Sequence, residues 1–111
     1  QDADFSGIIQ IKDGEVFFHG DSDGWAGFLG WSSTELIDKP FFNFVDPQDL
    51  IIGREALGQI TQGQNLRDIT IRLSKKDGGH RIVEFSAISK GNTWFWFARK
   101  LPDDFQVHPR N

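Results

Sequence analysis

The chain has 111 residues, of which 38% are hydrophobic, 25% charged and 14% aromatic, and its formal net charge is −4. This length fits one domain with one hydrophobic core. The absence of cysteine excludes disulfides, cysteine-ligated metals and thiol nucleophiles. The acidic balance leads us to expect no nucleic-acid partner. No apolar run reaches the ~20 residues of a membrane span, so we expect no membrane contact by this domain.

Two short strand-like runs open the sequence. Residues 7–11 (GIIQI) and 15–19 (EVFFH) are rich in the β-branched and aromatic side chains that favour strands. The pair Asp13-Gly14 between them is typical of tight hairpin turns. This part of the sequence predicts a β-hairpin. Because the chain begins with Gln1 and not with methionine, we expect it to be a piece of a longer protein.

Short helices follow the hairpin. Three N-cap residue types at 21–23 precede apolar residues at positions 25, 28 and 29, and this spacing predicts a helix of about two turns that ends at Gly30. A second short helix is predicted from Ser32 or Ser33, with Glu35 in a capping box. This helix must end before Pro40, because the residue before a proline disfavours helical geometry.

A longer helix is predicted over roughly 47–61. Asp46 can cap its start, Pro47 suits its first position, and Asp49 places a negative charge at the positive end of the helix dipole. These roles explain both carboxylates without catalysis. Gly63 is a natural stop, and one apolar face is formed by Leu50, Gly53, Leu57 and Ile60.

The last third of the sequence predicts three strands. Apolar and polar residues alternate over 68–74 and 83–87, and 93–98 is apolar on both faces. The turns between them fall at 75–79 and 90–92, where Lys75 and Lys76 are interpreted as a solvated turn. The whole order predicts an α+β fold: a five-stranded antiparallel sheet with short helices packed on one face.

Three segments in this order resemble the PAS domain family of sensory modules. Residues 27–37 (GFLGWSSTELI) are similar to the family's Leu-Gly-aromatic-Ser stretch that leads to Glu-Leu-Ile. Residues 44–50 (FVDPQDL) are similar to its Val-His-Pro-Asp-Asp helix start, with Asp46 in place of the usual His. Residues 72–79 (RLSKKDGG) are similar to its Arg-x-x-x-Lys-Asp-Gly hairpin. The domain boundaries that follow are an N-terminal flank at 1–5, a PAS-like domain at 6–101 and a C-terminal linker at 102–111.

The resemblance implies a sensory module of a larger signalling protein. It would sense a small ligand or a partner and transmit this signal through dimer contacts to an output domain further along the same chain. We expect the output domain to be a histidine kinase or diguanylate cyclase. The resemblance also implies that this domain lies in the cytoplasm, even if the parent protein is anchored in a membrane. A passive dimerisation module without ligand is the alternative. The sequence contains no catalytic motif that would support a small stand-alone enzyme, so we expect no catalysis by this domain.

No cofactor is predicted. The flavin-photoadduct branch of the family needs a reactive cysteine, which this chain lacks, and a family haem site needs a histidine that is absent between Ser32 and Gly63. We interpret His19 as a hydrogen-bonded structural residue, and His80 and His108 as solvated. Their separation does not suit a metal site. A small apolar ligand or metabolite remains compatible with the sequence.

Apolar residues expected to face the sheet interior are the candidates for a ligand cavity. We expect this space to be packed or to hold a small apolar cavity, in preference to a bound chromophore. The candidates are Ile9, Ile11, Phe28, Leu29, Phe42, Phe44, Leu57, Ile71, Phe85 and Trp94.

The last strand predicts an interaction surface. Its side chains alternate, so Trp94 and Trp96 point to one face and Phe95 and Phe97 to the other. Contiguous exposed apolar patches usually mark an interface. Phe95 and Phe97 are therefore interface candidates for a homodimer through the outer sheet face. The alternative occupant is an N-terminal helix of the parent protein that precedes the chain.

Overall fold

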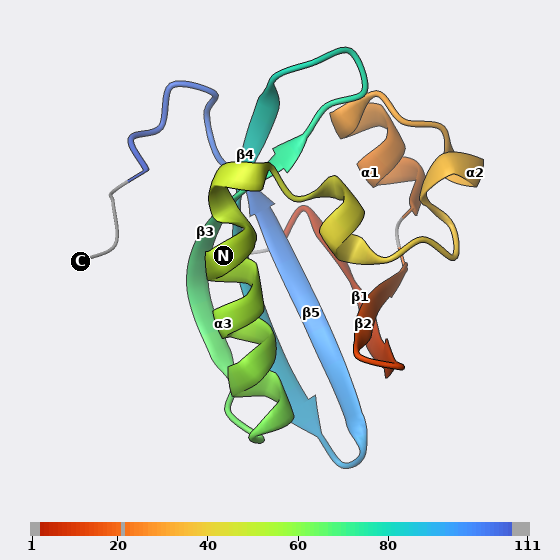
Figure 1. The fold of residues 1–111 in the computed structure, drawn as a ribbon, viewed down its shortest axis with the longest axis vertical. Coiled ribbons are helices and arrows are strands. Elements are labelled where there is room, and N and C mark those ends of the chain that lie inside the picture. Colours follow the sequence, from red (N-terminus) through yellow and green to blue (C-terminus); the bar gives the residue numbers. More distant parts are fainter. Residues whose placement is uncertain (1–2, 21, 108–111) are drawn as a thin grey trace.

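The computed structural model describes residues 3–20 and 22–107. The elements follow the order expected from the sequence (Figure 1). They are β1 (Phe5–Lys12), β2 (Glu15–Gly20), α1 (Ser22–Leu29), α2 (Ser33–Leu36), the 3₁₀ helices η1 (Phe41–Phe44) and η2 (Pro47–Asp49), α3 (Leu50–Thr61), β3 (Leu66–Ser74), β4 (His80–Lys90) and β5 (Thr93–Lys100). In the described residues no helix is long and apolar enough to span a membrane.

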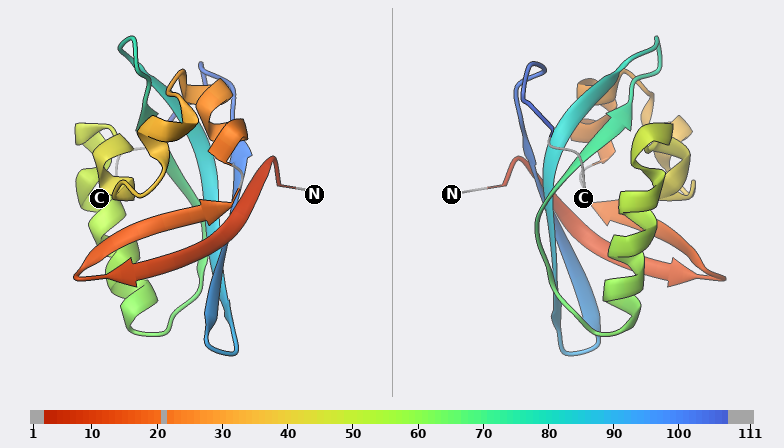
Figure 2. Two further views of the ribbon diagram at one scale, coloured as in Figure 1. Left: turned by 90° about the vertical axis from the view of Figure 1, so that its right-hand side faces the viewer. Right: turned by 60° about the vertical axis from the view of Figure 1, so that its left-hand side comes forward.

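The five strands form one antiparallel sheet in the order β2-β1-β5-β4-β3. The first hairpin therefore lies beside the last strand, because β1 pairs with β5. Figure 2 shows α3 against one face of the sheet, and the segment that follows β5 on the opposite face. This architecture confirms the α+β fold class predicted from the sequence.

The strand register decides which side chains face the helices. Ile9 lies opposite Trp94 and is buried with the core, whereas Ile8 lies opposite Phe95 on the outer face. Trp96 is fully buried at the centre of the inner face. Around it, the core cluster comprises Phe5, Ile9, Val16, Trp25, Leu29, Val45, Ile60, Leu66, Ile71, Leu73, Val83, Phe85, Ala87 and Ala98.

A glycine makes room for the central tryptophan. Gly7 pairs with Trp96 on one side and with Gly20 on the other. A Cβ at Gly7 would collide with the carbonyl oxygen of His19 and would lie 2.8 Å from Trp96 Nε1. That same carbonyl accepts a hydrogen bond of 3.2 Å from Trp96 Nε1. The absence of a side chain at position 7 thus lets the indole reach the backbone of β2.

The outer edge of β3 is covered by the segment that leads into α3. Val45 forms an isolated bridge with Leu73, and the backbone N–H of Asp46 donates to the carbonyl of Arg72 at 3.0 Å. The carboxylate of Asp46 caps η2 by accepting from the Gln48 N–H at 3.0 Å. Such cover pairs the free hydrogen-bonding groups at the C-terminal end of this edge strand.

Asp49 lies at the start of α3, as predicted, but it makes a contact that the sequence did not predict. Its side chain makes no capping hydrogen bond to α3 and instead accepts one of 2.7 Å from the backbone N–H of Arg72. The predicted helix itself is present, with a 3₁₀ turn at its start, and Gly53 and Ile60 are buried on its apolar face.

Candidate functional site

A pocket of about 320 Å³ opens between the first hairpin and the short helices. β2, α1, α2, the 37–40 connection and η1 surround it, while β3 and β5 supply its inner end. Its lining is mostly apolar and includes three phenylalanines and two tryptophans. The lining residues are Phe18, His19, Gly20, Trp25, Leu29, Leu36, Ile37, Asp38, Lys39, Phe41, Phe44, Leu73 and Trp96.

The aromatic walls of the pocket are stacked rings. The rings of Phe18 and Phe41 are 4.2 Å apart between centroids, at an interplanar angle of 8°. Phe18 also stacks on Trp96 at 5.1 Å and 21°. Trp25 also stacks on Trp96, with 5.6 Å between the ring centroids and an interplanar angle of 29°. These are offset-stacked geometries, which stabilise aromatic pairs beyond the burial of their area. These rings therefore form one continuous stack at the side of the pocket, in which Phe18 lies between Phe41 and Trp96.

Polar groups lie at the mouth of this pocket. Ile37 is 49% exposed, and Asp38 and Lys39 beside it are also exposed. Asp38 adopts a left-handed backbone with φ of 61°, which an aspartate tolerates better than most residues and which turns the chain toward Pro40. Deeper in the molecule, the described residues contain no buried side-chain nitrogen or oxygen without a hydrogen-bond partner.

Two of the ligand-cavity candidates, Leu29 and Phe44, line this pocket. The others lie elsewhere. Ile9, Ile71 and Phe85 are buried in the core, and Ile11 is exposed. The remaining ones are half-buried against the core and outside the pocket, namely Phe28, Phe42, Leu57 and Trp94.

Sequence reasoning missed most of the aromatic wall. Phe18, Trp25, Phe41 and Trp96 were not among the candidates, although all four line the pocket. The alternation of the last strand already placed Trp96 with Trp94 on one face, and this signal could have identified it. No local signal marked Phe41, which reaches the pocket through the path of the 37–40 connection.

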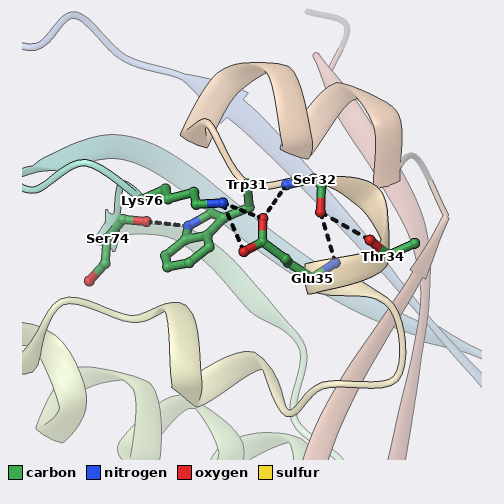
Figure 3. Close-up of polar contacts among 6 residues, drawn as sticks. All are labelled: Trp31, Ser32, Thr34, Glu35, Ser74 and Lys76. Atoms are coloured by element: carbon green, nitrogen blue, oxygen red, sulfur yellow. Dashed lines mark hydrogen bonds and ion pairs between the residues drawn. The ribbon is translucent and has the colours of Figure 1, made fainter.

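The segment next to the pocket is fixed by a polar cluster around α2 (Figure 3). Ser32 and Glu35 form the predicted capping box, with hydrogen bonds of 2.8 and 3.2 Å. Lys76 is exposed, as interpreted from the sequence, and its Nζ also binds both carboxylate oxygens of Glu35 at 3.0 Å. Trp31 Nε1 donates to the carbonyl of Ser74 at 3.0 Å. The β3–β4 turn thus holds α2 in place.

These contacts change the titration of one carboxyl. The hydrogen bond from the Ser32 backbone N–H and, next, the one from Lys76 lower the pKa of Glu35 to about 2. Both partners stabilise the charged form. Glu35 therefore stays ionised through the mildly acidic range.

The two histidines that the structure describes make contacts with side chains from other parts of the chain. His19 Nε2 pairs with Gln10 Oε1 at 2.9 Å on the exposed surface. His80 is half-buried, with Nδ1 3.4 Å from Asp46 Oδ2, and is therefore less solvated than expected. His108 lies outside the described residues. Among the residues described, no group of three or more His, Asp or Glu side chains could hold a metal ion.

The outer sheet face carries an apolar patch, here called the outer patch: Ile8, Ile88, Phe95 and Phe97. Phe95 pairs with Ile8 and with Ile88 on the two neighbouring strands. Phe97 is 37% exposed and Ile8 42%. Beside the patch, Arg99 Nη2 contacts Glu84 Oε1 at 2.7 Å, and this hydrogen bond raises the pKa of Arg99. The alternation predicted for the last strand is present.

A single arginine connects α1 with the segment after β5. Arg81 Nε donates to the carbonyl of Phe28, the guanidinium carbon lies 5.2 Å from the centre of the Phe28 ring, and Nη1 contacts Asp103 Oδ2 at 3.0 Å. Leu101 donates its backbone N–H to the carbonyl of Ile82 at 3.0 Å. Through Arg81, Phe28 of α1 is therefore connected to Asp103 in the segment after β5.

No protein-family model matches the sequence, and no curated protein matches it either. Solved structures do match. A domain of a sensory box sensor histidine kinase/response regulator from Geobacter sulfurreducens is 18% identical with a TM-score of 0.60, over 86% of this chain and 82% of that one. The light-state structure of the blue-light photoreceptor Aureochrome1 LOV is 18% identical with a TM-score of 0.65, over 92% and 84%. Both are PAS-fold domains.

The fold is PAS-like. This confirms the fold implied by the three sequence segments, and at this level of identity the likeness concerns the fold alone. The chain of this PAS-like domain has no cysteine that could form a flavin adduct. The indole N–H of Trp96, at the inner end of the pocket, already donates to the carbonyl of His19.

Proposed function

We propose that this chain is the sensory input module of a larger signalling protein, with a histidine kinase or a diguanylate cyclase as its output domain. Its pocket would bind a small ligand, and the segment after β5 would carry the response toward the output domain. The PAS-like fold supports the proposal, since the histidine kinase/response regulator domain shares it. The catalytic step would then belong to the output domain.

The observation that carries the proposal is the route from the pocket to the chain end. Trp25 lines the pocket and belongs to α1. Three residues further along the same helix, Phe28 is held by Arg81 through its carbonyl and its ring. Arg81 in turn binds Asp103. A ligand that shifts α1 therefore acts on the contact that fixes the C-terminal segment.

Such a relay needs two arrangements of α1 and the C-terminal segment that differ by a few kcal/mol, with the ligand binding one of them more tightly. The test is a thermal-shift screen of small metabolites, followed by amide hydrogen exchange with each compound that raises the melting temperature. We expect a binder to change exchange in residues 101–107. Binders that leave this segment unchanged would contradict the relay.

A dimerisation module without ligand is the second candidate, and the outer patch favours it. Ile8, Phe95 and Ile88 form a row across three adjacent strands. We propose that a second copy of the chain covers this face, because a row of exposed apolar side chains usually marks an interface. The passive function predicts dimers whose amide exchange responds to none of the metabolites.

A further inference from the structure

We propose that β2 and the pocket beside it bind an extended segment of a partner protein, which joins the sheet as a further strand and places one apolar side chain in the pocket. This inference goes beyond the proposed sensory function and does not depend on it. In strand addition, main-chain hydrogen bonds supply affinity and a pocket for a side chain supplies specificity. The free edge of β2 and the pocket that it borders offer both.

The turn of the first hairpin shows which backbone groups of β2 point away from β1. Asp13 and Gly14 have φ of 54° and 78°. These values are typical of a type I′ turn, whose hydrogen bond joins the residues on either side of it. From there, hydrogen-bonded and non-hydrogen-bonded pairs alternate along an antiparallel ladder. Val16 and Phe18 therefore direct their N–H and C=O groups toward the free side of β2.

These outward backbone groups have no partner in the described part of the chain. β2 is an edge strand, and apart from the β1–β2 ladder no described residue forms a hydrogen bond with the backbone of Val16 or Phe18. The opposite edge differs, because residues 45–49 occupy part of β3. Unpaired groups in a row along an edge are a template for another strand. β2 is thus the edge at which strand addition is expected.

The pocket lies next to this edge. Phe18 and Gly20 of β2 line it, and Ile37 on the other side of the mouth is 49% exposed. Phe18 is on the inner face of the sheet, since its cross-strand partner Ile9 is buried with the core. A residue of an added strand opposite Phe18 also faces inward, because cross-strand partners share a face. Its side chain therefore points to the mouth of the pocket.

The volume of the pocket suits one large apolar side chain. A cavity of about 150 Å³ lined by aliphatic and aromatic side chains holds benzene, which is larger than the side chain of leucine. The pocket has about 320 Å³, and its inner lining includes Leu29, Leu36 and Leu73. Burial of a leucine side chain there removes apolar surface from water, which favours binding. The partner segment therefore carries leucine, or a residue of similar size, opposite Phe18.

The charge of the hairpin end gives a second feature of the partner. Residues 12–15 include Lys12, Asp13 and Glu15, so this turn carries an excess of one negative charge. Glu15 is exposed at the start of β2. An antiparallel partner, which pairs more stably than a parallel one, places the third residue after its leucine opposite Glu15. Opposite charges stabilise such a pair, so that residue is lysine or arginine.

A six-residue peptide, acetyl-STLTVK-amide, tests the proposal. Its leucine lies opposite Phe18 and its lysine opposite Glu15, and threonine and valine favour strands. In NMR spectra of the 111-residue chain, we expect the peptide to shift the amide resonances of Val16 and Phe18 and to slow their hydrogen exchange. The amides of Phe17 and His19 point to β1 and should shift less. No binding at millimolar peptide, or shifts confined to other parts of the chain, would overturn the inference.

Two altered peptides test the main chain and the side chain separately. Methylation of the leucine nitrogen removes the N–H that donates to the carbonyl of Phe18 and keeps the leucine side chain. We expect this peptide to bind about tenfold more weakly, because a hydrogen bond is lost. Replacement of the leucine by alanine keeps the main chain and should weaken binding by about tenfold or more. Unchanged affinity of the methylated peptide would contradict strand addition, and unchanged affinity of the alanine peptide would contradict the use of the pocket.

An exchange of charge tests the register of the partner. We expect Glu15→Lys to bind acetyl-STLTVK-amide about threefold more weakly and acetyl-STLTVE-amide about threefold more tightly than the unaltered chain does. Glu55→Lys is the matched control, since it makes the same change of charge at an exposed position of α3. If Glu15→Lys and Glu55→Lys change the affinity for both peptides equally, the proposed register is wrong.

A pair of variants tests the site from the side of the helices. Leu36→Trp narrows the pocket and should weaken peptide binding, whereas Ile51→Trp adds the same side chain at a position that is 73% exposed. Circular dichroism of each variant separates loss of binding from loss of fold. A metabolite that binds the pocket and changes amide exchange in residues 101–107, in a chain that does not bind the peptide, would support the sensory function and overturn this inference.

Discussion

The carboxylate of Asp49 and the backbone of Arg72 join the start of α3 to the edge of the sheet. Asp49 Oδ2 accepts the Arg72 N–H at 2.7 Å, and Asp49 Oδ1 lies 3.6 Å from Arg72 Nη1. Asp49 is 2% exposed, so the charge has left water and depends on these partners. One side chain thus closes the edge of β3 and fixes the direction in which α3 leaves it.

The first prediction concerns this contact. Asp49→Ala leaves the buried N–H of Arg72 without its acceptor, and we expect the free energy of unfolding to fall by about 1.5–3 kcal/mol, as for a hydrogen bond to a charged group. Asp49→Asn keeps an acceptor oxygen and should cost less. Urea denaturation of the two variants measures the difference. If Asp49→Ala and Asp49→Asn lower the free energy of unfolding equally, the hydrogen bond to the Arg72 backbone does not account for the contribution of Asp49 to stability.

The second prediction concerns pH and Glu35. Its pKa is lowered from 4.5 to about 2 in the folded chain, so its contribution to stability is fully present above pH 4.5 and disappears as the pH falls toward 2. Glu35→Gln should therefore lower the melting temperature at neutral pH, and the difference from the unaltered chain should vanish near pH 2. Glu15→Gln, at the exposed hairpin turn, is the control. A difference that stays constant with pH would argue against the ionised contact with Lys76.

The third prediction concerns the space beneath Trp96. Gly7→Ala places a Cβ against the carbonyl of His19, which cannot move without disturbing the β1–β2 pairing. We expect a loss of about 1–3 kcal/mol, as for other overpacked sites. Gly58→Ala in α3 meets no atom within 4 Å and should gain about 0.5–1 kcal/mol of stability from helix propensity. Thermal unfolding of both variants gives the comparison, and similar effects would refute the packing argument.

The fourth prediction concerns the outer patch. If a second copy covers it, the double variant Phe95→Ser, Phe97→Ser should shift the mass in sedimentation equilibrium from dimer to monomer. Ile51→Ser removes a more exposed apolar side chain from α3 and should leave the dimer intact. A chain that is monomeric before and after the change would favour the other occupant, an N-terminal helix of the parent protein.

The fifth prediction concerns the end of the chain. Asp103→Asn weakens the contact with Arg81, and we expect faster amide exchange in residues 103–107. Global stability should change by only about 0–1 kcal/mol, because the pair is exposed to solvent. Asp104→Asn is the matched control, since its side chain has no ion pair in the described part of the chain. If amide exchange in residues 103–107 is unchanged after Asp103→Asn, the contact between Arg81 and Asp103 has no part in the proposed relay.

The order of elements could be predicted because its signals are local. Asp13-Gly14 turns the first hairpin, the Ser32–Glu35 capping box starts α2, and Asp46-Pro47 starts the helical segment that continues into α3. Each of these acts within a few residues, so the sequence alone displays it. The alternation in β5 likewise placed Trp96 and Phe97 on opposite faces.

The pocket could not be predicted in this way. Its walls come from residues as distant as Phe18 and Trp96, and which rings face a cavity depends on the path of the 37–40 connection. The pattern of apolar residues cannot separate a residue that fills the core, such as Phe85 in β4, from one that borders the pocket, such as Phe41 in η1. Asp49 shows the same limit. A helix-start aspartate looks alike in sequence whether it caps the helix or binds a strand.

The cover on β3 has a consequence for how the chain can misassemble. Residues 45–49 occupy the edge that a strand from another molecule would need for edge-to-edge growth. Because this cover is tethered to the same chain, its effective concentration far exceeds that of a competing molecule. We therefore expect that edge-to-edge growth through β3 requires residues 45–49 to detach from this strand first.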